Sequence, residues 1–599
     1  MDRVNPLLED WGGDFGLPPW DRITDADFAP AFAAALAEGR AAVAAIAGNP
    51  EAPSYANTIE ALELADAALS RMAGVFYNLV GTDSNPAREA LSRDLAPQMA
   101  DYASEVTSNR ALFARIEDLW ARRDELGLDP EQARVLMLYR RMFLRAGAGL
   151  DDAGSARMKA IKARLASLGT QFGQNLLADE RDWAMPLDDL SGLPDFVVDA
   201  AAAAAAERGL EGHAVTLNRS LIVPFLQYSP RRDLRKQAYE AWVVRGARGG
   251  ATDNRAIAAE TLALRHERAH LLGHASFAAF KLETEMAGTP AAVRDLLERV
   301  WAPARSRAEA DAAALEALLQ ADGHAGPLEP WDWRFYSEKL RLQRHDFDEA
   351  ALKPYLSLDA MIAAAFDVAN RLFGLEFRPL AVPLHHPDVR AWEVTRDGRH
   401  MAVFLGDYFA RPSKRSGAWC SAIRAQKKLG GEIRPIVVNV CNFAKGSPAL
   451  LSWDDARTLF HEFGHALHQI LSDVTHEFIS GTSVARDFVE LPSQLYEHWL
   501  EVPEVIETHA RHWKTGAAMP AELREKLKGA AHWDQGFATV EFIASAMVDL
   551  AFHEGQPPAD PMQRQAALLE AMGMPRAIRM RHATPHFAHV FAGDGYAAG

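Results

Sequence analysis

Residues 452–471 read SWDDARTLFHEFGHALHQIL and predict the helix around which the rest of the chain is organised. Ser452 can cap the N-terminus of this helix, and Asp455, three residues later, completes a capping-box pattern. Apolar residues recur at helical spacing and give the helix one buried face. These residues are Leu459, Phe460, Phe463, Leu467, Ile470 and Leu471.

The same helix carries a pair of candidate metal ligands. His461 and His465 are four residues apart, so both imidazoles project from one face. Two neutral imidazoles one turn apart fit adjacent corners of a zinc tetrahedron. Glu462 points to the side, where it can reach a water molecule beside the metal without binding the metal. The alternative is two histidines on an ordinary helix, but in so apolar a helix they would be costly without a partner.

A catalytic zinc ion needs a third protein ligand and an open fourth position. The metzincin pattern would place glycine at 468 and histidine at 471, but the chain has His468 and Leu471, which excludes that class. Residues 487–500, DFVELPSQLYEHWL, predict a second helix with Glu490 and Glu497 on one side. Either glutamate could be the third ligand. Taken alone, each would be expected to lie on the surface or behind the ligands.

The rest of the chain reads as mainly helical with a small sheet. Helical spacing of apolar residues predicts helices over Ala31–Ile46, Thr58–Leu79 and Ser155–Leu177, with Pro30 at the start of the first. Strand-like runs are Ser220–Tyr228, Met401–Leu405 and Pro435–Phe443. The last of these precedes the histidine motif. It is either a scaffold strand or a sheet edge that holds an extended peptide.

A change of composition near residues 185–195, in MPLDDLSGLPDF, predicts a boundary or a long turn. On that basis we expect an N-terminal helical region over residues 1–190 and a second region, with the metal motif, over residues 191–599.

Composition excludes several classes of partner. Among 599 residues, 64 are Lys or Arg and 81 are Asp or Glu, which gives a net charge of −17. So acidic a chain lacks the basic field that nucleic acid or an anionic membrane requires. Only two cysteines suit a reducing compartment, and the N-terminus has no basic segment followed by an apolar one. We therefore expect a cytoplasmic protein, and a monomer.

Two segments resemble the thimet oligopeptidase (M3) family of zinc peptidases, and within it the bacterial peptidyl-dipeptidases. They are LFHEFGHALH, residues 459–468, and SGTSVARDFVELPSQLYEHW, residues 480–499. The likeness covers nearly the whole chain and includes NPEAPSYANTIEALE, residues 49–63, and KRSGAWC, residues 414–420. The resemblance implies a prolate, two-halved zincin-type fold with a deep central channel that admits short unstructured peptides.

The resemblance also assigns roles. It implies that Glu490 is the third zinc ligand beside His461 and His465, and that Glu462 is the general base. Glu497 is a candidate to orient a zinc-bound imidazole, as carboxylates behind metal ligands often do. Peptidyl-dipeptidases of this kind release dipeptides from the C-terminal end of a peptide. An endo-oligopeptidase with the same chemistry is the alternative.

The final residues 586–599, HFAHVFAGDGYAAG, resemble the start of a family motif that donates hydrogen bonds to the reacting carbonyl oxygen. His589 and Tyr596 match its first members. The family pattern continues with further tyrosines and helices after the position of Gly599, so we expect the chain to be truncated. A zinc- and peptide-binding chain with little or no turnover is therefore a third possibility.

Overall fold

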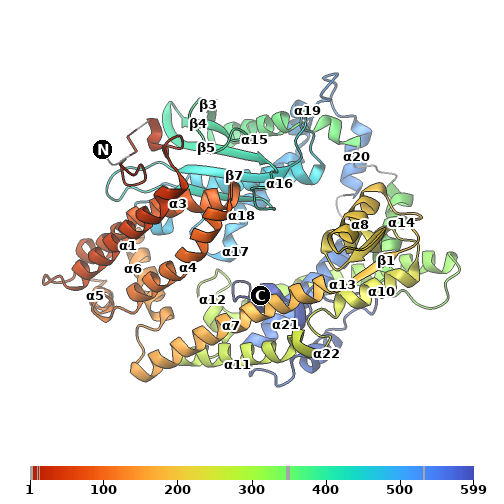
Figure 1. Cartoon of the computed structure of the whole chain (residues 1–599), viewed down its shortest axis with the longest axis horizontal. Coiled ribbons are helices and arrows are strands. Elements are labelled where there is room, and N and C mark those ends of the chain that lie inside the picture. Colours follow the sequence, from red (N-terminus) through yellow and green to blue (C-terminus); the bar gives the residue numbers. More distant parts are fainter. Residues whose placement is uncertain (1–3, 10, 13, 346–350, 531–532, 599) are drawn as a thin grey trace. The chain divides into compact units, whose positions relative to one another are not determined.

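The computed structural model describes residues 4–9, 11–12, 14–345, 351–530 and 533–598. The chain is mainly helical with two small sheets, as expected (Figure 1). It divides into two compact units, each formed from separate stretches of sequence. Unit 1 comprises Met1–Gly149 and Asp348–Leu523, and unit 2 comprises Leu150–Phe347 and Arg524–Gly599. These units differ from the regions 1–190 and 191–599 expected from the sequence. Each unit joins two segments that are far apart in the chain, and a change of composition at one point cannot mark such a division.

Unit 1 begins with six helices and a π-helical turn. They are α1 (Asp25–Ala47), the turn η2 (Ala56–Glu60), α2 (Ala61–Ala65), α3 (Ala67–Thr82), α4 (Pro86–Thr107), α5 (Arg110–Ala121) and α6 (Pro130–Ala146). The start predicted for the first helix at Pro30 is wrong: a capping box of Thr24 and Asp27 starts α1 earlier, and Pro30 lies inside it. The helix expected over Thr58–Leu79 is interrupted at Asp66, which accepts a hydrogen bond from Tyr102.

The second part of unit 1 contains a five-stranded sheet in the order β3-β4-β5-β7-β6. The strands are β3 (Leu375–Pro379), β4 (Arg390–Arg396), β5 (Arg399–Phe409), β6 (Trp419–Arg424) and β7 (Ile436–Phe443). Only β5 and β7 pair in parallel. The strands expected over Met401–Leu405 and Pro435–Phe443 are confirmed as parts of β5 and β7. Because β7 lies between β5 and β6, it is a scaffold strand and not the sheet edge that could hold a peptide. The edge strand on this side is β6.

Helices accompany this sheet in unit 1 (Figure 1). They are α15 (Leu358–Phe373), α16 (Trp453–Ile470), α17 (Arg486–Val489), α18 (Leu491–Leu500) and α19 (Pro503–His509). Helix α20 (Ala521–Ala530) follows in the chain and begins just before Leu523, the last residue of unit 1. Helix α16 packs on β7 and β6. Its Phe463 meets the rings of Phe366, Phe377 and Phe404 at centroid distances of 5.5, 5.6 and 5.3 Å. This aromatic contact secures α16 on the sheet and on α15.

Unit 2 is almost entirely helical. Its elements are α7 (Asp152–Arg181), β1 (Ala184–Leu187), α8 (Asp195–Glu207), β2 (His213–Thr216), α9 (Arg219–Tyr228), α10 (Arg232–Val243), α11 (Arg255–Leu271), α12 (Phe277–Leu282), α13 (Pro290–Ala321), α14 (Trp333–His345), α21 (Gln535–Glu554), α22 (Pro561–Ala571) and α23 (Ala588–Phe591). The helix expected over Ser155–Leu177 is confirmed within α7.

The strand predicted over Ser220–Tyr228 is wrong, because this segment is α9. Asn218 caps the helix by accepting a hydrogen bond from the Ser220 amide. The buried side chains are Leu221, Ile222, Phe225 and Leu226, which is helical spacing. A short apolar run such as residues 220–228 fits a helix or a strand equally well from its sequence. The pattern of buried residues in the folded chain shows that it is a helix.

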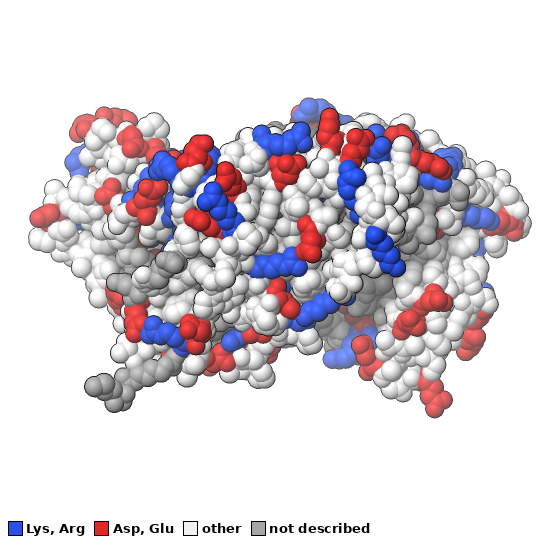
Figure 2. Space-filling model, turned by 90° about the horizontal axis from the view of Figure 1, so that it is seen from above, with Lys and Arg blue, Asp and Glu red and all other residues white. Residues whose placement is uncertain are grey.

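Helices α1 and α21 are each long and apolar enough to cross a membrane by length and composition. In α21, 72% of the apolar window is buried inside the protein, as in a core helix. In α1 the share is 39%. On the face seen in Figure 2, Lys and Arg side chains are interspersed with Asp and Glu, and the visible coloured residues do not form a continuous basic patch.

A buried ion pair ties the N-terminal helices of unit 1 to the segment that follows α16. His476 Nδ1 lies 2.7 Å from Glu63 Oε2, and both side chains are almost fully buried. Tyr55 Oη lies 3.1 Å from His476 Nε2. Burial lowers the pKa of His476, but its hydrogen bond and charge interaction with Glu63 outweigh burial and raise the pKa above 6.5. The protonated imidazole therefore stabilises the fold.

We expect Glu63→Gln to lower the free energy of unfolding by about 1–3 kcal/mol, because it leaves a buried donor poorly satisfied. Since the folded-state pKa of His476 is raised, the stability from its charge is fully present below the unfolded pKa of about 6.5 and is lost as pH rises through the folded pKa. Urea unfolding at several pH values should thus give a difference between wild type and variant that is largest below about pH 6 and narrows above it. Glu38→Gln, on the exposed face of α1, is the control. A difference independent of pH would contradict a charged His476.

Candidate metal centre

Helix α16 starts as the sequence predicts. The Asp455 amide donates to Ser452 Oγ at 3.0 Å, and the Ser452 amide donates to the Asp455 carboxylate at 3.0 Å. This confirmed capping box sets where the helix begins, and hence which residues face the sheet. His461 and His465 then lie on one face, with ring centroids 4.9 Å apart and planes at 86°.

Glu490 meets these two histidines from the junction of α17 and α18. Its Oε2 atom lies 3.2 Å from Nε2 of His461 and 3.2 Å from Nε2 of His465. Pro492 is in the first turn of α18, where its missing amide costs nothing. Ser493 Oγ donates a hydrogen bond to Glu490 Oε2 at 2.9 Å, and this contact restricts the rotation of the Glu490 carboxylate. The structure thus brings together the three residues that the family resemblance implies as ligands.

The donor atoms fit a divalent cation. One ligand atom from each of His461, His465 and Glu490 lies within 4.8 Å of the others. His461 Nδ1 lies 2.6 Å from Glu497 Oε1, so the ring proton belongs on Nδ1. The Nε2 lone pair then faces the Glu490 oxygen, and two acceptors 3.2 Å apart are stable when a cation lies between them. Two imidazoles and one carboxylate are a zinc donor set.

Glu462 lies beside these donors in a different environment. Its side chain is only 5% exposed, and Oε2 is buried without a hydrogen bond among the described residues. Burial, opposed by His461 and assisted by Glu490, raises the pKa of Glu462 to about 7. A bound cation would favour the ionised form. A carboxyl group with a pKa near neutrality can accept and return a proton.

Glu497 is held between two basic groups. One oxygen faces His461 Nδ1, and the other accepts a hydrogen bond from Arg457 Nε, one turn before His461 on α16. Its side chain is 12% exposed, so it is not an ordinary surface carboxylate. Such a carboxylate sets the imidazole's tautomer and orientation. Arg457 was not among the residues predicted for the site, although its spacing of four from His461 places it on the same face of the helix.

Gly464 is the second residue that sequence reasoning missed. A Cβ there would lie 2.7 Å from the Pro492 carbonyl oxygen and 2.9 Å from Tyr496 Cβ. Only glycine therefore allows α18 to approach α16 so closely. Tyr496 in turn donates a hydrogen bond to the Ala365 carbonyl at 2.7 Å and anchors α18 on α15. The available signal was a glycine in the middle of an otherwise strong helix, where it is unfavourable without a packing reason.

Four further residues were weighed for a role at the site, and the structure describes each within its own unit. Burial lowers the pKa of His468, whose ring packs edge-on against Phe488 at 6.1 Å. His498 is exposed. His589 and Tyr596 lie in unit 2, with ring centroids 5.7 Å apart, and Tyr596 is 60% exposed. The structure brings these last two residues together.

Comparison with known proteins identifies the family of the chain. The model of peptidase family M3 matches residues 225–599. A dipeptidyl carboxypeptidase from Escherichia coli (strain K12) is 37% identical over 614 aligned residues, which cover 100% of this chain and 90% of the relative. An oligopeptidase A from Salmonella typhimurium (strain LT2) is 32% identical and covers 100% of this chain and 90% of the relative.

A helix with paired histidines and an adjacent glutamate, joined by a carboxylate from the next helix, defines a metallopeptidase of the zincin type. The chain belongs to peptidase family M3, and it is a peptidase related to dipeptidyl carboxypeptidase and oligopeptidase A.

We expect Gly464→Ala to weaken zinc binding about 10-fold or more. The added methyl group pushes α18 away and moves Glu490 from the two imidazoles. Competition with a chromophoric chelator measures the affinity. Gly173→Ala is a matched control, since Gly173 is also helical and a Cβ there meets nothing within 4 Å. Equal zinc affinity in both variants would show that the close helix contact does not position Glu490.

Proposed function

We propose that the chain is a zinc-dependent peptidase that hydrolyses short, unstructured peptides and releases C-terminal dipeptides. The observation that carries this proposal is the meeting of His461, His465 and Glu490 beside the buried Glu462. The named dipeptidyl carboxypeptidase relative supports dipeptide release. Internal cleavage is the second candidate, supported by the oligopeptidase A relative. We also propose a cytoplasmic monomer without a nucleic-acid or membrane partner, in keeping with the net charge of −17.

The chemistry would divide between the ion and the protein. When bound, zinc polarises the scissile carbonyl and makes water a better nucleophile. Glu462 accepts a proton from the attacking water and later donates it to the leaving amine nitrogen. Glu497 keeps His461 in the tautomer that leaves Nε2 available to the ion. His589 and Tyr596 are proposed, from the family resemblance, as hydrogen-bond donors to the carbonyl oxygen as negative charge develops.

The products of a blocked peptide test the reaction. We expect the zinc-loaded chain to shorten an N-acetylated octapeptide by successive C-terminal dipeptides, seen by mass spectrometry. Glu462→Gln should abolish this cleavage while zinc content stays unchanged, since it removes the proton acceptor and keeps the size of the side chain. One internal cut would favour the endo-oligopeptidase. Absence of cleavage by a folded, zinc-loaded chain would favour a protein that binds peptides without hydrolysing them. Activity in Glu462→Gln would refute the role of Glu462 as the general base.

The proposed donors can be tested separately. We expect Tyr596→Phe and His589→Gln each to lower kcat by about 10²–10³, with KM and zinc content little changed, because a donor to a developing oxyanion acts mainly in the transition state. Tyr77→Phe, which alters another exposed tyrosine, serves as control. Activity equal to that of the control would remove these two residues from the site.

A further inference from the structure

A pocket formed entirely by unit 2 concentrates positive charge in an otherwise acidic protein. Five arginines line it, with Glu541 as the one carboxylate in its lining: Arg219, Arg245, Arg334, Arg579 and Arg581. They come from α9, α14 and the chain segments after α10 and α22, so only the folded unit brings them together. The whole chain carries a net charge of −17, and such a cluster is costly by mutual repulsion unless something compensates it.

The pocket's own acids compensate only part of this charge. Arg334 Nη2 lies 3.3 Å from Glu541 Oε2, and Arg245 forms a close ion pair with Glu180. Arg219, Arg579 and Arg581 make no side-chain ion pair or hydrogen bond within the described part of the chain. Burial, followed by the charge of Arg581, lowers the pKa of Arg219. These three cationic side chains therefore have no ion pair of their own among the described residues, and the charge of Glu541, which pairs with Arg334, also acts on Arg219.

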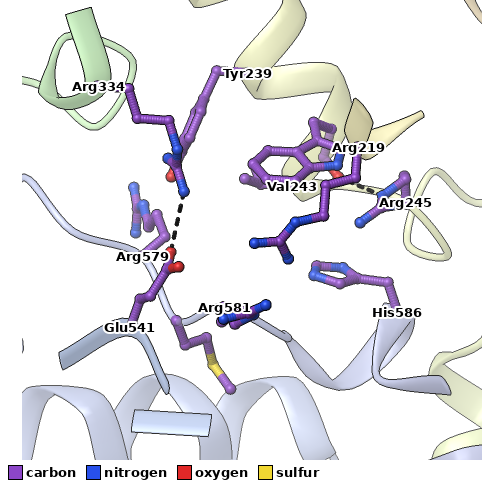
Figure 3. Close-up of a pocket in the computed structure, with 11 residues that line it drawn as sticks. Arg219, Tyr239, Val243, Arg245, Arg334, Glu541, Arg579, Arg581 and His586 are labelled. Carbon is purple, nitrogen blue, oxygen red and sulfur yellow. Dashed lines mark hydrogen bonds and ion pairs between the residues drawn. The ribbon is translucent and has the colours of Figure 1, made fainter. Parts of the chain in front are cut away.

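His586 adds a buried donor to the same pocket. It is 8% exposed, and its Nε2 accepts a hydrogen bond from the Ala583 amide at 3.1 Å. A neutral imidazole that accepts at Nε2 carries its proton on Nδ1. The nearby Arg245 backbone interacts with the ring, but Nδ1 makes no hydrogen bond of ordinary geometry among the described residues. Figure 3 shows the imidazole directed toward the guanidinium of Arg219, with Arg581 beside them. Three donors thus converge here, and no side chain that the structure describes offers them an acceptor of ordinary hydrogen-bond geometry.

Several of these groups are held in place without the ligand. The guanidinium carbons of Arg245 and Arg334 lie 5.6 and 5.7 Å from the ring centroid of Trp242. The Arg581 amide donates to the Glu541 carbonyl at 2.7 Å, which fixes this segment against α21. Cation–π contacts and a pinned backbone reduce the entropy that a ligand must overcome.

We propose that this pocket is a binding site for a small oxyanion, a phosphate or carboxylate group, held by Arg219, Arg581 and His586. Arginine suits this task because its planar guanidinium donates two parallel hydrogen bonds to such groups. The site uses none of the residues of the metal centre and does not depend on peptide hydrolysis. A free phosphate and the terminal carboxylate of a peptide are the two sources of the ligand.

Calorimetry of the full chain with inorganic phosphate, at constant ionic strength set with sodium chloride, tests the proposal. We expect saturable binding at one site, weakened about 10-fold or more in Arg219→Gln and in Arg581→Gln, because each loses a charge-assisted hydrogen bond. Arg564→Gln, an exposed arginine of α22 in the same unit, should bind as wild type. Absence of saturable binding, or equal binding in all three variants, would overturn the site.

Thermal unfolding gives a second readout that does not require the ligand. In phosphate-free buffer of low ionic strength, Arg581→Gln should unfold at the same temperature as wild type or higher, because it removes repulsion, and phosphate should no longer raise its Tm. A lower Tm in that buffer would mean that Arg581 is a structural residue and would refute the proposal.

The source of the oxyanion is distinguished by competition. An N-acetylated tripeptide with a free carboxylate is compared with its C-terminal amide, using Glu462→Gln so that neither is consumed. Displacement of phosphate by the acid alone identifies a peptide carboxylate as the ligand. Displacement by neither, with phosphate still bound, identifies free phosphate.

Discussion

The candidate metal centre depends on the close approach of two helices, α16 and α18, at Gly464. The Pro492 carbonyl and Tyr496 Cβ occupy the space that any larger side chain would need. At this separation a carboxylate at the start of α18 reaches both imidazoles of α16. The aromatic packing of Phe463 on the sheet and the hydrogen bond of Tyr496 to α15 fix the two helices independently. The ligand geometry is thus a consequence of backbone packing.

Electrostatics support the proposal that this arrangement holds a cation. Glu497 holds the proton of His461 on the far side of the ring, and this leaves a lone pair directed at Glu490. Glu462, adjacent to His461 in the sequence, is buried, and its Oε2 atom makes no hydrogen bond among the described residues. Without a cation these acceptors repel one another in a site of reduced polarity. The pocket of unit 2 presents the opposite case, in which five arginines and a histidine converge around a single carboxylate, Glu541.

Much of unit 1 could be predicted where a local pattern was long enough. The capping box at Ser452, the apolar face of α16 and the strands β5 and β7 agree with expectation. Shorter sequence patterns gave wrong predictions of secondary structure. Ser220–Tyr228 is helical because Asn218 caps it and its buried residues follow a helical period. From the residues alone, Glu490 and Glu497 remained equivalent, because spacing on one helix cannot say which carboxylate meets the open face of an imidazole and which meets its Nδ1 side.

The sequence by itself determined the helix that carries His461, Glu462 and His465, because helix periodicity and capping are local properties of adjacent residues. Family membership likewise follows from the order of residues. The tertiary structure alone decided the distance between α16 and α18, the partners of Glu497, and the convergence of Arg219 and Arg581 with His586. These features join residues that are tens to hundreds of positions apart. Their placement depends on how whole helices pack, and no local pattern records that.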